Sequence, residues 1–399
     1  MGFAELNALD SCIKCSICTS YCPVARVSDR FAGPKQNGPD LERFRLQGAV
    51  VNPSIEYCTN CKNCVIACPS GVNISAMNCR AKAEYVSAQG VSIRDRMLSG
   101  VEVMGRLSRI SPALANLAVN NKVVRWLGEK FLGVSSRMPM PGFSPKTFRD
   151  MLNSGEQLRS ERKVIYFPGC YVNYTNPKVG LALVSVLNRN GIEVIPGEFG
   201  CCGLPMISGG MLDDVRAHAL KNMKIIKKYA DLGHPLITSC PSCSLSIRQE
   251  YRELFGFSPD QAGAQVFDIF EYLLMLNEKG YFDTGFKSFP LRAGYHLPCH
   301  LKAAGMGSPS RELLSFIPGC KIIDLDAGCC GLAGSYGFKK EKYPVSMAIG
   351  LDLFSAINLS GLSNLVTECG MCRLQIYNGT GILASHPVEL LAKAYIGEI

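Results

Sequence analysis

The chain begins its cysteine-rich part with the stretch CIKCSICTSYCP, residues 12–23. The same spacing returns in CTNCKNCVIACP, residues 58–69, so both stretches follow the pattern C-x2-C-x2-C-x3-C-P. Ten further cysteines form two sets of five, and corresponding members of the two sets are 128 or 129 positions apart. The sets are Cys170, Cys201, Cys202, Cys240 and Cys243, and then Cys299, Cys329, Cys330, Cys369 and Cys372. A constant offset of this kind indicates duplication of one unit.

The repeated C-x2-C-x2-C-x3-C-P run is the ligand pattern of cubane 4Fe-4S clusters in bacterial two-cluster ferredoxins. Three cysteines of a run bind one cluster, and the fourth reaches the other cluster. Zinc in an all-cysteine site would use two C-x2-C pairs and would need neither the third cysteine nor the trailing Cys-Pro. The pattern therefore predicts two cubane clusters, one on Cys12, Cys15, Cys18 and Cys68, the other on Cys58, Cys61, Cys64 and Cys22.

The composition indicates a folded, multi-domain protein that works with reduced thiols. The 399 residues are 47% hydrophobic and 19% charged, and no run of eighteen apolar residues predicts a membrane-spanning helix. The first residues lack the basic and apolar regions of a secretory signal, so we expect metal-bound thiols in the cytoplasm. The net charge of +9, without a nucleic-acid motif, favours an acidic partner or anionic lipid over DNA or RNA.

Changes in amino-acid composition and in cysteine motifs divide the chain into four parts. Residues 1–90 hold both ferredoxin-type runs, with a Gly/Pro-rich connector between them and a predicted helix over residues 74–87. Residues 91–158 carry no cluster cysteine and are rich in Lys and Arg. The two five-cysteine units fill residues 159–288 and 289–399.

The basic part, residues 91–158, contains an amphipathic stretch over residues 121–132. Val124, Leu127 and Phe131 share one helix face, and Trp126 lies at its border. The opposite face carries Lys122, Arg125 and Glu129. Basic helices with an aromatic residue at the polar boundary suit a bilayer interface. The alternative is an ordinary amphipathic helix packed on its own domain or on a partner subunit.

Both five-cysteine units follow an α/β pattern. Short apolar strands are expected at residues 164–167, 192–195 and 236–238 in the first unit and at 292–296, 322–323 and 364–367 in the second. Each strand leads into a cysteine group. Because open α/β folds build their sites at the carboxyl ends of parallel strands, the cysteines of each unit should gather there. The predicted fold class is thus α/β and multi-domain, with a helical two-cluster ferredoxin-like domain ahead of two duplicated α/β units.

The five-cysteine units resemble the CCG domain of the heterodisulfide reductase B subunits, in which C, CCG and C-P-x-C follow one another. The second unit departs from this pattern with Gly370 in place of proline. The resemblance implies that each set can hold a non-cubane 4Fe-4S cluster, so up to two such clusters are expected. Five thiolates exceed what a cubane needs, which agrees with this implication.

The whole arrangement resembles the C subunits of anaerobic glycerol-3-phosphate dehydrogenases. The features that carry the resemblance are the connector over residues 33–40, the PGCYVNY stretch at 168–174 and the CCGLAGSYGFKKE stretch at 329–341. It implies an iron-sulfur subunit that takes electrons from flavoprotein subunits and passes them to menaquinone. It also implies a peripheral position at the cytoplasmic face of the inner membrane and a role as membrane anchor. No G-x-G-x-x-G follows a strand, so no flavin or NAD site is expected in this chain.

His296 and His300 flank Cys299 and are candidates for proton supply to a quinone or a bound substrate. The alternative is that they bond to cluster sulfur or fix the loop. Cys79 and Cys320 match no motif and are expected to be bystanders. Two other functions share these modules: the iron-sulfur subunit of a lactate or glycolate dehydrogenase, and a catalytic subunit of the heterodisulfide reductase type. A further alternative is a soluble electron carrier without a membrane role.

Overall fold

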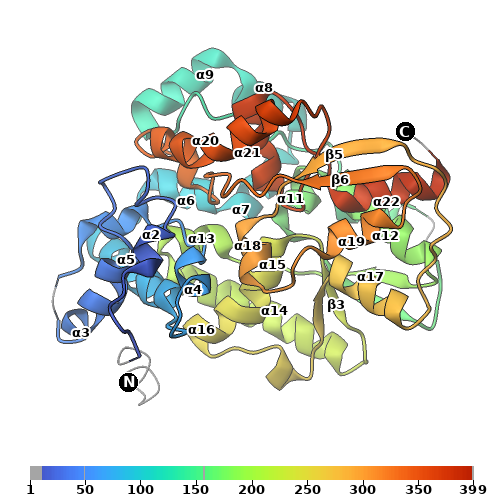
Figure 1. Ribbon diagram of the computed structural model, residues 1–399, viewed down its shortest axis with the longest axis horizontal. Helices are drawn as coiled ribbons and strands as arrows, with labels where there is room; N and C mark the ends of the chain where they lie inside the picture. The colour runs from blue at the N-terminus through green and yellow to red at the C-terminus, as the bar shows by residue number, and fades with distance from the viewer. Residues whose placement is uncertain (1–10, 49, 156–157, 398–399) are drawn as a thin grey trace.

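The computed structural model describes residues 11–48, 50–155 and 158–397. Helices of the N-terminal part lie together on one side of the molecule, and two sheets with their helices form the rest (Figure 1). Neither sheet contains an antiparallel pair. The predicted α/β class, with a helical N-terminal part and two duplicated units, is confirmed.

The N-terminal part is built from short helices and one long one. The long helix α5 begins after Asn73, whose side chain accepts a hydrogen bond from the Ala76 amide at 3.2 Å, and it ends before Gly90. It confirms the predicted helix and extends it by two residues. The helices are α2 (Ile17–Ser20), η1 (Gln36–Asp40), α3 (Leu41–Arg45), η2 (Pro53–Tyr57), α4 (Asn63–Ile66) and α5 (Ile74–Gln89).

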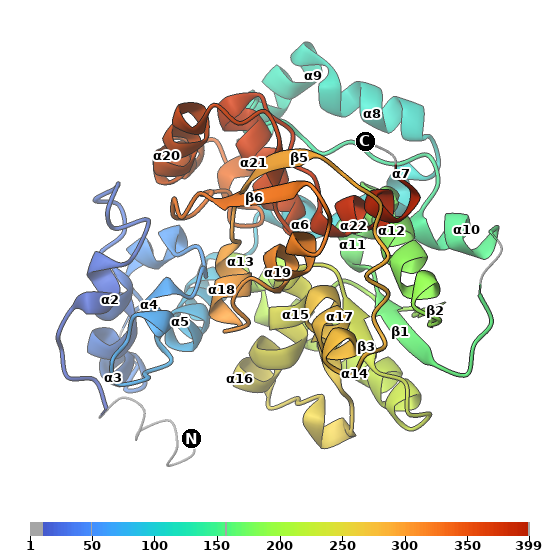
Figure 2. The ribbon, with the colours of Figure 1, turned by 45° about the vertical axis from the view of Figure 1, so that its right-hand side comes forward.

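A chain of short helices follows, of which α8 and α9 lie at the outer rim of the molecule in both ribbon views (Figures 1 and 2). No residue of α8, α9 or η3 is buried. The helices are α6 (Ile93–Ser99), α7 (Val101–Ser108), α8 (Pro112–Asn120), α9 (Lys122–Leu127), η3 (Gly128–Leu132) and α10 (Phe148–Asn153).

The amphipathic helix formed by α9 and η3 turns Arg125 and Glu129 of its polar face inward, whereas Lys122 is exposed. Arg125 donates to the main-chain carbonyl oxygens of Ser135 and Met138, and Glu129 accepts from the amide and hydroxyl of Ser136. The apolar side chains on the other face are exposed, with Phe131 at 73% and Trp126 at 54%. One of the expected alternatives, packing of the apolar face on its own domain, is therefore wrong.

The first unit contains a four-stranded parallel sheet with the order β2-β1-β3-β4. Ile165 of the central strand β1 is in register with Ile195 and Leu236 of its neighbours. The elements are β1 (Lys163–Phe167), α11 (Gly169–Tyr174), α12 (Pro177–Arg189), β2 (Glu193–Pro196), α13 (Leu204–Gly209), α14 (Leu212–Ala230), β3 (Leu236–Thr238), α15 (Pro241–Leu245), η4 (Ser246–Glu250), α16 (Tyr251–Phe255), η5 (Asp260–Ala262), β4 (Val266–Asp268) and α17 (Ile269–Glu278).

The second unit repeats this plan with a parallel three-stranded sheet, order β6-β5-β7. The fourth strand is reduced to one parallel bridge between Val366 and Ser385. Asp268 and His386 cap the helices that follow these matching positions, each with a glutamate three residues later. The elements are β5 (Leu291–Tyr295), α18 (Cys299–Ala303), α19 (Pro309–Ser315), β6 (Cys320–Asp324), η6 (Tyr336–Phe338), α20 (Tyr343–Ser360), β7 (Leu365–Val366), α21 (Gly370–Thr380) and α22 (Pro387–Ile396).

The two units share one hydrophobic core. Val164 and Tyr166 of β1 belong to the same buried cluster as Ala293 and Tyr295 of β5. Helix α12 of the first unit also packs against α22 at the end of the second. The carboxyl ends of both sheets are therefore held in a fixed relation to each other.

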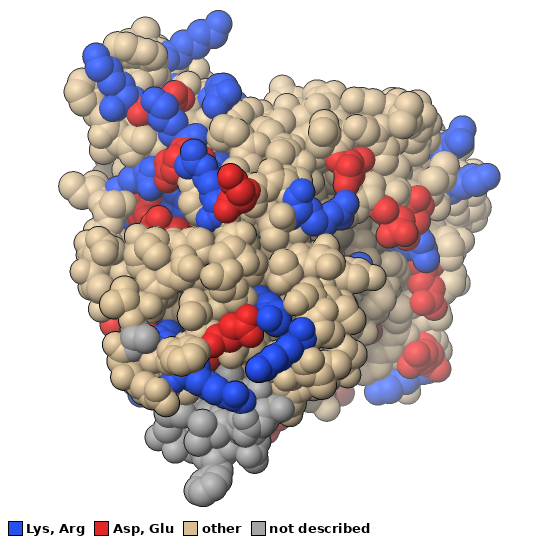
Figure 3. All heavy atoms as spheres, turned by 60° about the vertical axis from the view of Figure 1, so that its left-hand side comes forward, with Lys and Arg blue, Asp and Glu red and all other residues tan. Residues whose placement is uncertain are grey.

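Charge is spread thinly over the face shown in Figure 3. Lys and Arg side chains alternate there with Asp and Glu, and wide uncharged areas separate them. Among the described residues no helix has both the length and the apolar character needed to cross a bilayer.

Candidate iron-sulfur centres

In each ferredoxin-type run, the second cysteine lies between two residues whose backbone has a left-handed conformation. Lys14 and Ser16 flank Cys15 with φ of 60° and 63°, and Asn60 and Lys62 have φ of 53° and 62° on either side of the middle cysteine of the second run. Non-glycine residues rarely adopt this conformation, and such strain concentrates at functional sites. The same pair of strained residues in both runs indicates that both loops are shaped to enclose a group.

The loops bring together the cysteines that the motif predicted. Burial raises the pKa of the Cys22 thiol to about 11, and the nearby Cys58 adds to this effect. Burial also raises the pKa of Cys64, with Cys61 and Cys58 as its next largest causes. In the other group, burial and the neighbouring Cys12 and Cys15 raise the pKa of Cys18. Cys68 packs, like Cys12, against the small apolar cluster that contains both Cys18 and Cys64, so the two predicted cubane sites adjoin each other.

The first five-cysteine set assembles where three parallel strands end. Cys170 follows β1, the Cys201-Cys202 pair follows β2, and Cys240 and Cys243 follow β3. Their thiols contact one another in the sequence Cys170, Cys201, Cys202, Cys243, Cys240. Sites in open α/β folds form at this edge of the sheet.

The second set assembles in the same way after β5, β6 and β7. Its thiols contact one another in the sequence Cys299, Cys329, Cys330, Cys372, Cys369. Hydrogen bonds from Cys299 and Cys330 hold the pKa of Cys329 well below its usual range. Cys201, at the matching position of the first set, has a lowered pKa through the same two bonds. Thiolates are the form that binds metal, so both sets suit metal ligation.

The glycine of each CCG triplet is required by close packing. Gly203 has φ of +84°, and a Cβ there would lie 2.9 Å from a methyl group of Val215. Gly331 has φ of +86°, and its Cβ would lie 2.2 Å from the carbonyl oxygen of Ser346. In both units the glycine amide donates to the sulfur two residues earlier, Cys201 or Cys329, at 3.4 Å.

Several residues that support the first set are not apparent from motifs. Asn222 accepts from the Gly200 amide and donates to the Cys201 carbonyl, and the Tyr251 hydroxyl donates to the Cys202 carbonyl, each at 3.0 Å. Asn222 occupies the buried face of α14 together with Val215, Ala219 and Ile226. A polar residue in this apolar stripe is the one sequence signal that could have revealed it.

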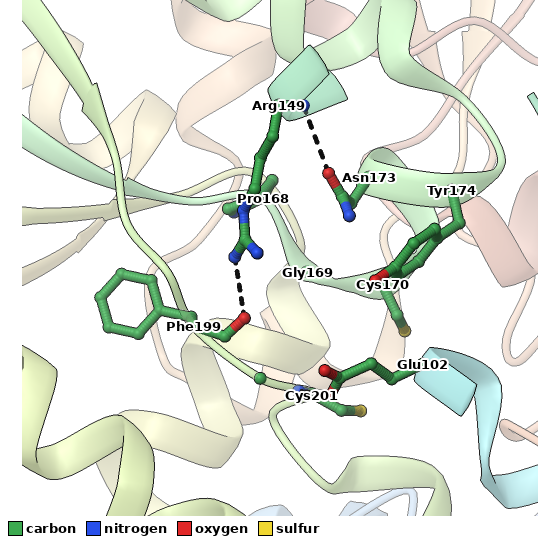
Figure 4. A pocket seen from close by; sticks show the side chains of 10 residues that line it. Glu102, Arg149, Pro168, Gly169, Cys170, Asn173, Tyr174, Phe199 and Cys201 are labelled. Carbon is green, nitrogen blue, oxygen red and sulfur yellow. Dashed lines mark hydrogen bonds between the residues drawn. The ribbon is translucent and has the colours of Figure 1, made fainter. Parts of the chain in front are cut away.

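Glu102 of α7 reaches the first set from the basic part of the chain. Its Oε2 atom accepts from the Cys201 amide at 2.8 Å. Together with Arg149, Asn173 and Tyr174 it lines a narrow pocket beside the thiols of the first and second cysteines of the set, Cys170 and Cys201 (Figure 4). Arg149 also donates to the carbonyl oxygens of Gly197 and Phe199, which holds the loop after β2.

Both candidate histidines are buried beside the second set. A ring nitrogen of His296 and the sulfurs of Cys330 and Cys372 all lie within 4.8 Å of one another, and its Nε2 atom has no hydrogen-bond partner. A cluster sulfide at this position would accept that bond, so the residues fit an iron-sulfur group. His300 bonds through Nδ1 to Ser242 at 2.8 Å and through Nε2 to the Asn60 carbonyl at 3.1 Å. These contacts suit the alternative role, in which the histidines hold the site.

The remaining cysteines belong to none of the predicted ligand sets, although Cys79 lies in one buried cluster with Cys202 and Cys243. Cys79 is buried and donates to the Asn60 side chain at 3.4 Å, and Cys320 lies at the start of β6. All twenty cysteines are free of disulfide bonds.

Comparison with protein families supports this assignment of modules. Residues 8–72 match the 4Fe-4S dicluster domain, and residues 164–248 and 293–377 match the cysteine-rich CCG domain. The chain is therefore an iron-sulfur protein that carries 4Fe-4S clusters and serves electron transport.

Relatives match the chain over nearly its whole length. The C subunit of the anaerobic glycerol-3-phosphate dehydrogenase of Escherichia coli (strain K12) is 38% identical over 97% of this chain and 99% of its own. The B subunit of the fumarate reductase (CoM/CoB) of Methanothermobacter marburgensis is 27% identical over 98% of this chain and 74% of its own. The D subunit of the dihydromethanophenazine:CoB--CoM heterodisulfide reductase of Methanosarcina mazei is 23% identical over 98% and 95%. This chain belongs to the family of anaerobic glycerol-3-phosphate dehydrogenase C subunits.

Proposed function

We propose that this protein carries electrons from a flavin-dependent sn-glycerol-3-phosphate dehydrogenase to menaquinone at the cytoplasmic face of the inner membrane. The observation that carries the proposal is the combination of four separate cysteine sites with full-length similarity to a C subunit of this dehydrogenase. Relatives from heterodisulfide reductases are less similar, at 23% identity, so a disulfide-cleaving role has weaker support.

The cysteine sites are assigned as the sequence predicts. The two ferredoxin-type sets would hold two cubane 4Fe-4S clusters, and the two five-cysteine sets would hold non-cubane 4Fe-4S clusters. When bound, these groups supply one-electron redox chemistry. The chain itself contributes thiolates and N–H donors to sulfur, and it buries three cysteines of each five-cysteine set, Cys201, Cys202 and Cys243, and Cys330, Cys369 and Cys372.

The exposed apolar surface supports a membrane role. Exposed apolar side chains recur from α7 through η3, and the most exposed of them are Ile110, Leu114, Leu117, Val123 and Phe131. Lys130 lies over the Trp126 ring at 5.1 Å, and Lys122 is exposed beside it. Apolar side chains bordered by cations match the interface of an anionic bilayer, where a lipid-soluble quinone is available.

Glycerol 3-phosphate is the proposed electron source, and the test is whether it reduces the clusters of this chain through the flavoprotein. The anaerobically purified protein is mixed with the flavoprotein subunits of an anaerobic glycerol-3-phosphate dehydrogenase, and glycerol 3-phosphate is added while 4Fe-4S signals are followed by EPR. Reduction of the clusters only when flavoprotein and glycerol 3-phosphate are both present is expected. Reduction by lactate or glycolate, with none by glycerol 3-phosphate, would assign the chain to another dehydrogenase.

A further inference from the structure

The N-terminal part meets the second five-cysteine site. Asn63, which lies between Cys61 and Cys64, lines the same pocket as Cys299 and Cys329, and α4 of the N-terminal part packs against α18 of the second unit. Cys329 packs against the same apolar cluster that contains Cys22 and has Cys58 at its border. The predicted second cubane site and the second five-cysteine site are therefore neighbours.

The two five-cysteine sites in turn face each other. Cys240 of the first and Cys369 of the second line one small cavity of about 20 Å³. Tyr171, the residue after Cys170, lines it too and packs on Gly370, where a Cβ would lie 2.4 Å from the tyrosine ring. The unusual glycine of the second unit thus makes room for an aromatic ring from the first.

The first of these sites is joined to the exposed apolar helices by a direct hydrogen bond, whereas the second reaches them through Met138, which shares a buried cluster with Cys330 and Cys372 and accepts from Arg125 of α9. Glu102 of α7 bonds to the Cys201 amide, and Val103 and Leu107 of the same helix are 60% and 55% exposed. The pocket beside the second site is lined instead by Asn63 of the N-terminal part and by polar residues of its own unit, among them Lys302 and Asp324.

From these contacts we infer that the sites form a single path and that the first five-cysteine site is the exit to the quinone. Electrons would pass from the ferredoxin-type sites to the second five-cysteine site, then across the Tyr171–Gly370 contact to the first. This order rests on the proposed function. The partner's reduced flavin loses two electrons, which travel one at a time, and the quinone takes up both electrons and two protons to become the quinol.

The order is tested by removing one five-cysteine cluster at a time in the complex with the flavoprotein. The variants are Cys243→Ser for the first site and Cys372→Ser for the second, and dithionite reduction shows by EPR which clusters each retains. The electron source is flavin reduced by light, so the test requires neither glycerol 3-phosphate nor a quinone. In Cys243→Ser the second site should be reduced at the wild-type rate. In Cys372→Ser reduction of the first site should be at least tenfold slower. The opposite pattern, or wild-type rates in both, would overturn the order.

A further measurement uses the wild-type protein, so it does not depend on whether a variant folds. As the clusters are reduced stepwise, the EPR signal of the second cubane should be split or broadened by the second five-cysteine site. A cubane signal that instead responds to the first site would overturn the order as well.

The exit is tested with a soluble menaquinone analogue. Quinol formation should fall at least tenfold in Cys243→Ser, although its second site is still reduced. Reoxidation of the second site by the quinone at the wild-type rate in this variant would overturn the exit assignment. If glycerol 3-phosphate fails to reduce the wild-type complex while light-reduced flavin gives the expected order, the donor assignment is wrong and the path stands.

Discussion

The ammonium group of Lys342 donates a hydrogen bond to the main-chain carbonyl oxygen of Glu56 at 2.8 Å. Lys342 belongs to the second unit, and Glu56 lies two residues before Cys58. Burial lowers the pKa of Lys342 to about 7, and the neighbouring cations Lys339 and Lys82 lower it further. Lys82 itself donates to the Cys58 carbonyl. Buried cations thus gather beside the predicted second cubane site, where an anionic cluster would compensate them.

Replacement of this cation should lower the reduction potential of the second cubane. In Lys342→Met the extra electron of the reduced cluster loses a nearby positive charge, and the expected change is on the order of 50–100 mV toward negative values. An EPR-monitored redox titration measures it. Lys340→Met is the matched control, because its side chain is more than half exposed and should shift the potential little. Equal potentials in wild type and Lys342→Met would show that the cation does not act on this cluster.

Loss of Cys64 should remove one cubane only. Four clusters of four irons correspond to about sixteen irons per chain, and Cys64→Ser is expected to retain about twelve. Cys79→Ser is the control, since Cys79 is buried as well but lies outside every set. Anaerobic iron and sulfide analysis with EPR checks both variants. About eight irons in the wild-type protein would remove the five-cysteine sites from the account, and an unchanged cubane signal in Cys64→Ser would contradict its ligand assignment.

The exposed apolar surface over α7, α8, α9 and η3 should bind anionic membranes. Flotation with liposomes that contain anionic lipid is expected at low salt and should weaken at high salt, because part of the attraction is electrostatic. Trp126→Ser combined with Phe131→Ser should reduce flotation severalfold without loss of fold, since both side chains are mostly exposed. Leu359→Ser is a control, as Leu359 is 88% exposed on α20. Failure of the wild-type protein to float at either salt concentration would assign the surface to a partner subunit.

Replacement of His296 and His300 should change the rate of menaquinol formation but not the pH dependence of that rate. His300 connects Ser242 of the first unit to Asn60 of the N-terminal part, so His300→Asn combined with His296→Asn should loosen the second site and slow menaquinol formation severalfold. The pH profile between pH 6 and 8 should keep its shape, and dye reduction by the flavoprotein should be unchanged. A profile displaced by the double substitution would instead support proton supply by these residues.

Much of the fold follows from local sequence patterns. Each strand before a cysteine group is short and contains apolar residues shortly before the group, so its position could be predicted to within about two residues. The cysteine spacing also predicts which thiols share a cluster, because ligands of one cluster must converge, and this assignment stays a prediction. Helix α5 was predictable for similar reasons, since its apolar residues recur at helical spacing.

What the sequence did not predict depends on contacts between distant segments. Periodicity shows that α9 is amphipathic, but only the carbonyl groups of Ser135 and Met138 decide that Arg125 faces inward. The hydrogen bond between the Glu102 side chain and the Cys201 amide joins residues 99 positions apart, and no sequence motif predicts it. The order of the cysteine sites could not be predicted either, because it depends on how the units pack against each other.

The central claim is that electrons from glycerol 3-phosphate reach menaquinone through this chain. The most direct measurement is a single turnover in liposomes that contain a menaquinone analogue, with the flavoprotein and the iron-loaded chain added and glycerol 3-phosphate mixed in anaerobically. We predict that the 4Fe-4S signals appear and then decay as quinol forms, with one quinol for each glycerol 3-phosphate oxidised. Quinol formed at the same rate when this chain is omitted, or clusters that stay reduced in the presence of the quinone, would contradict the account.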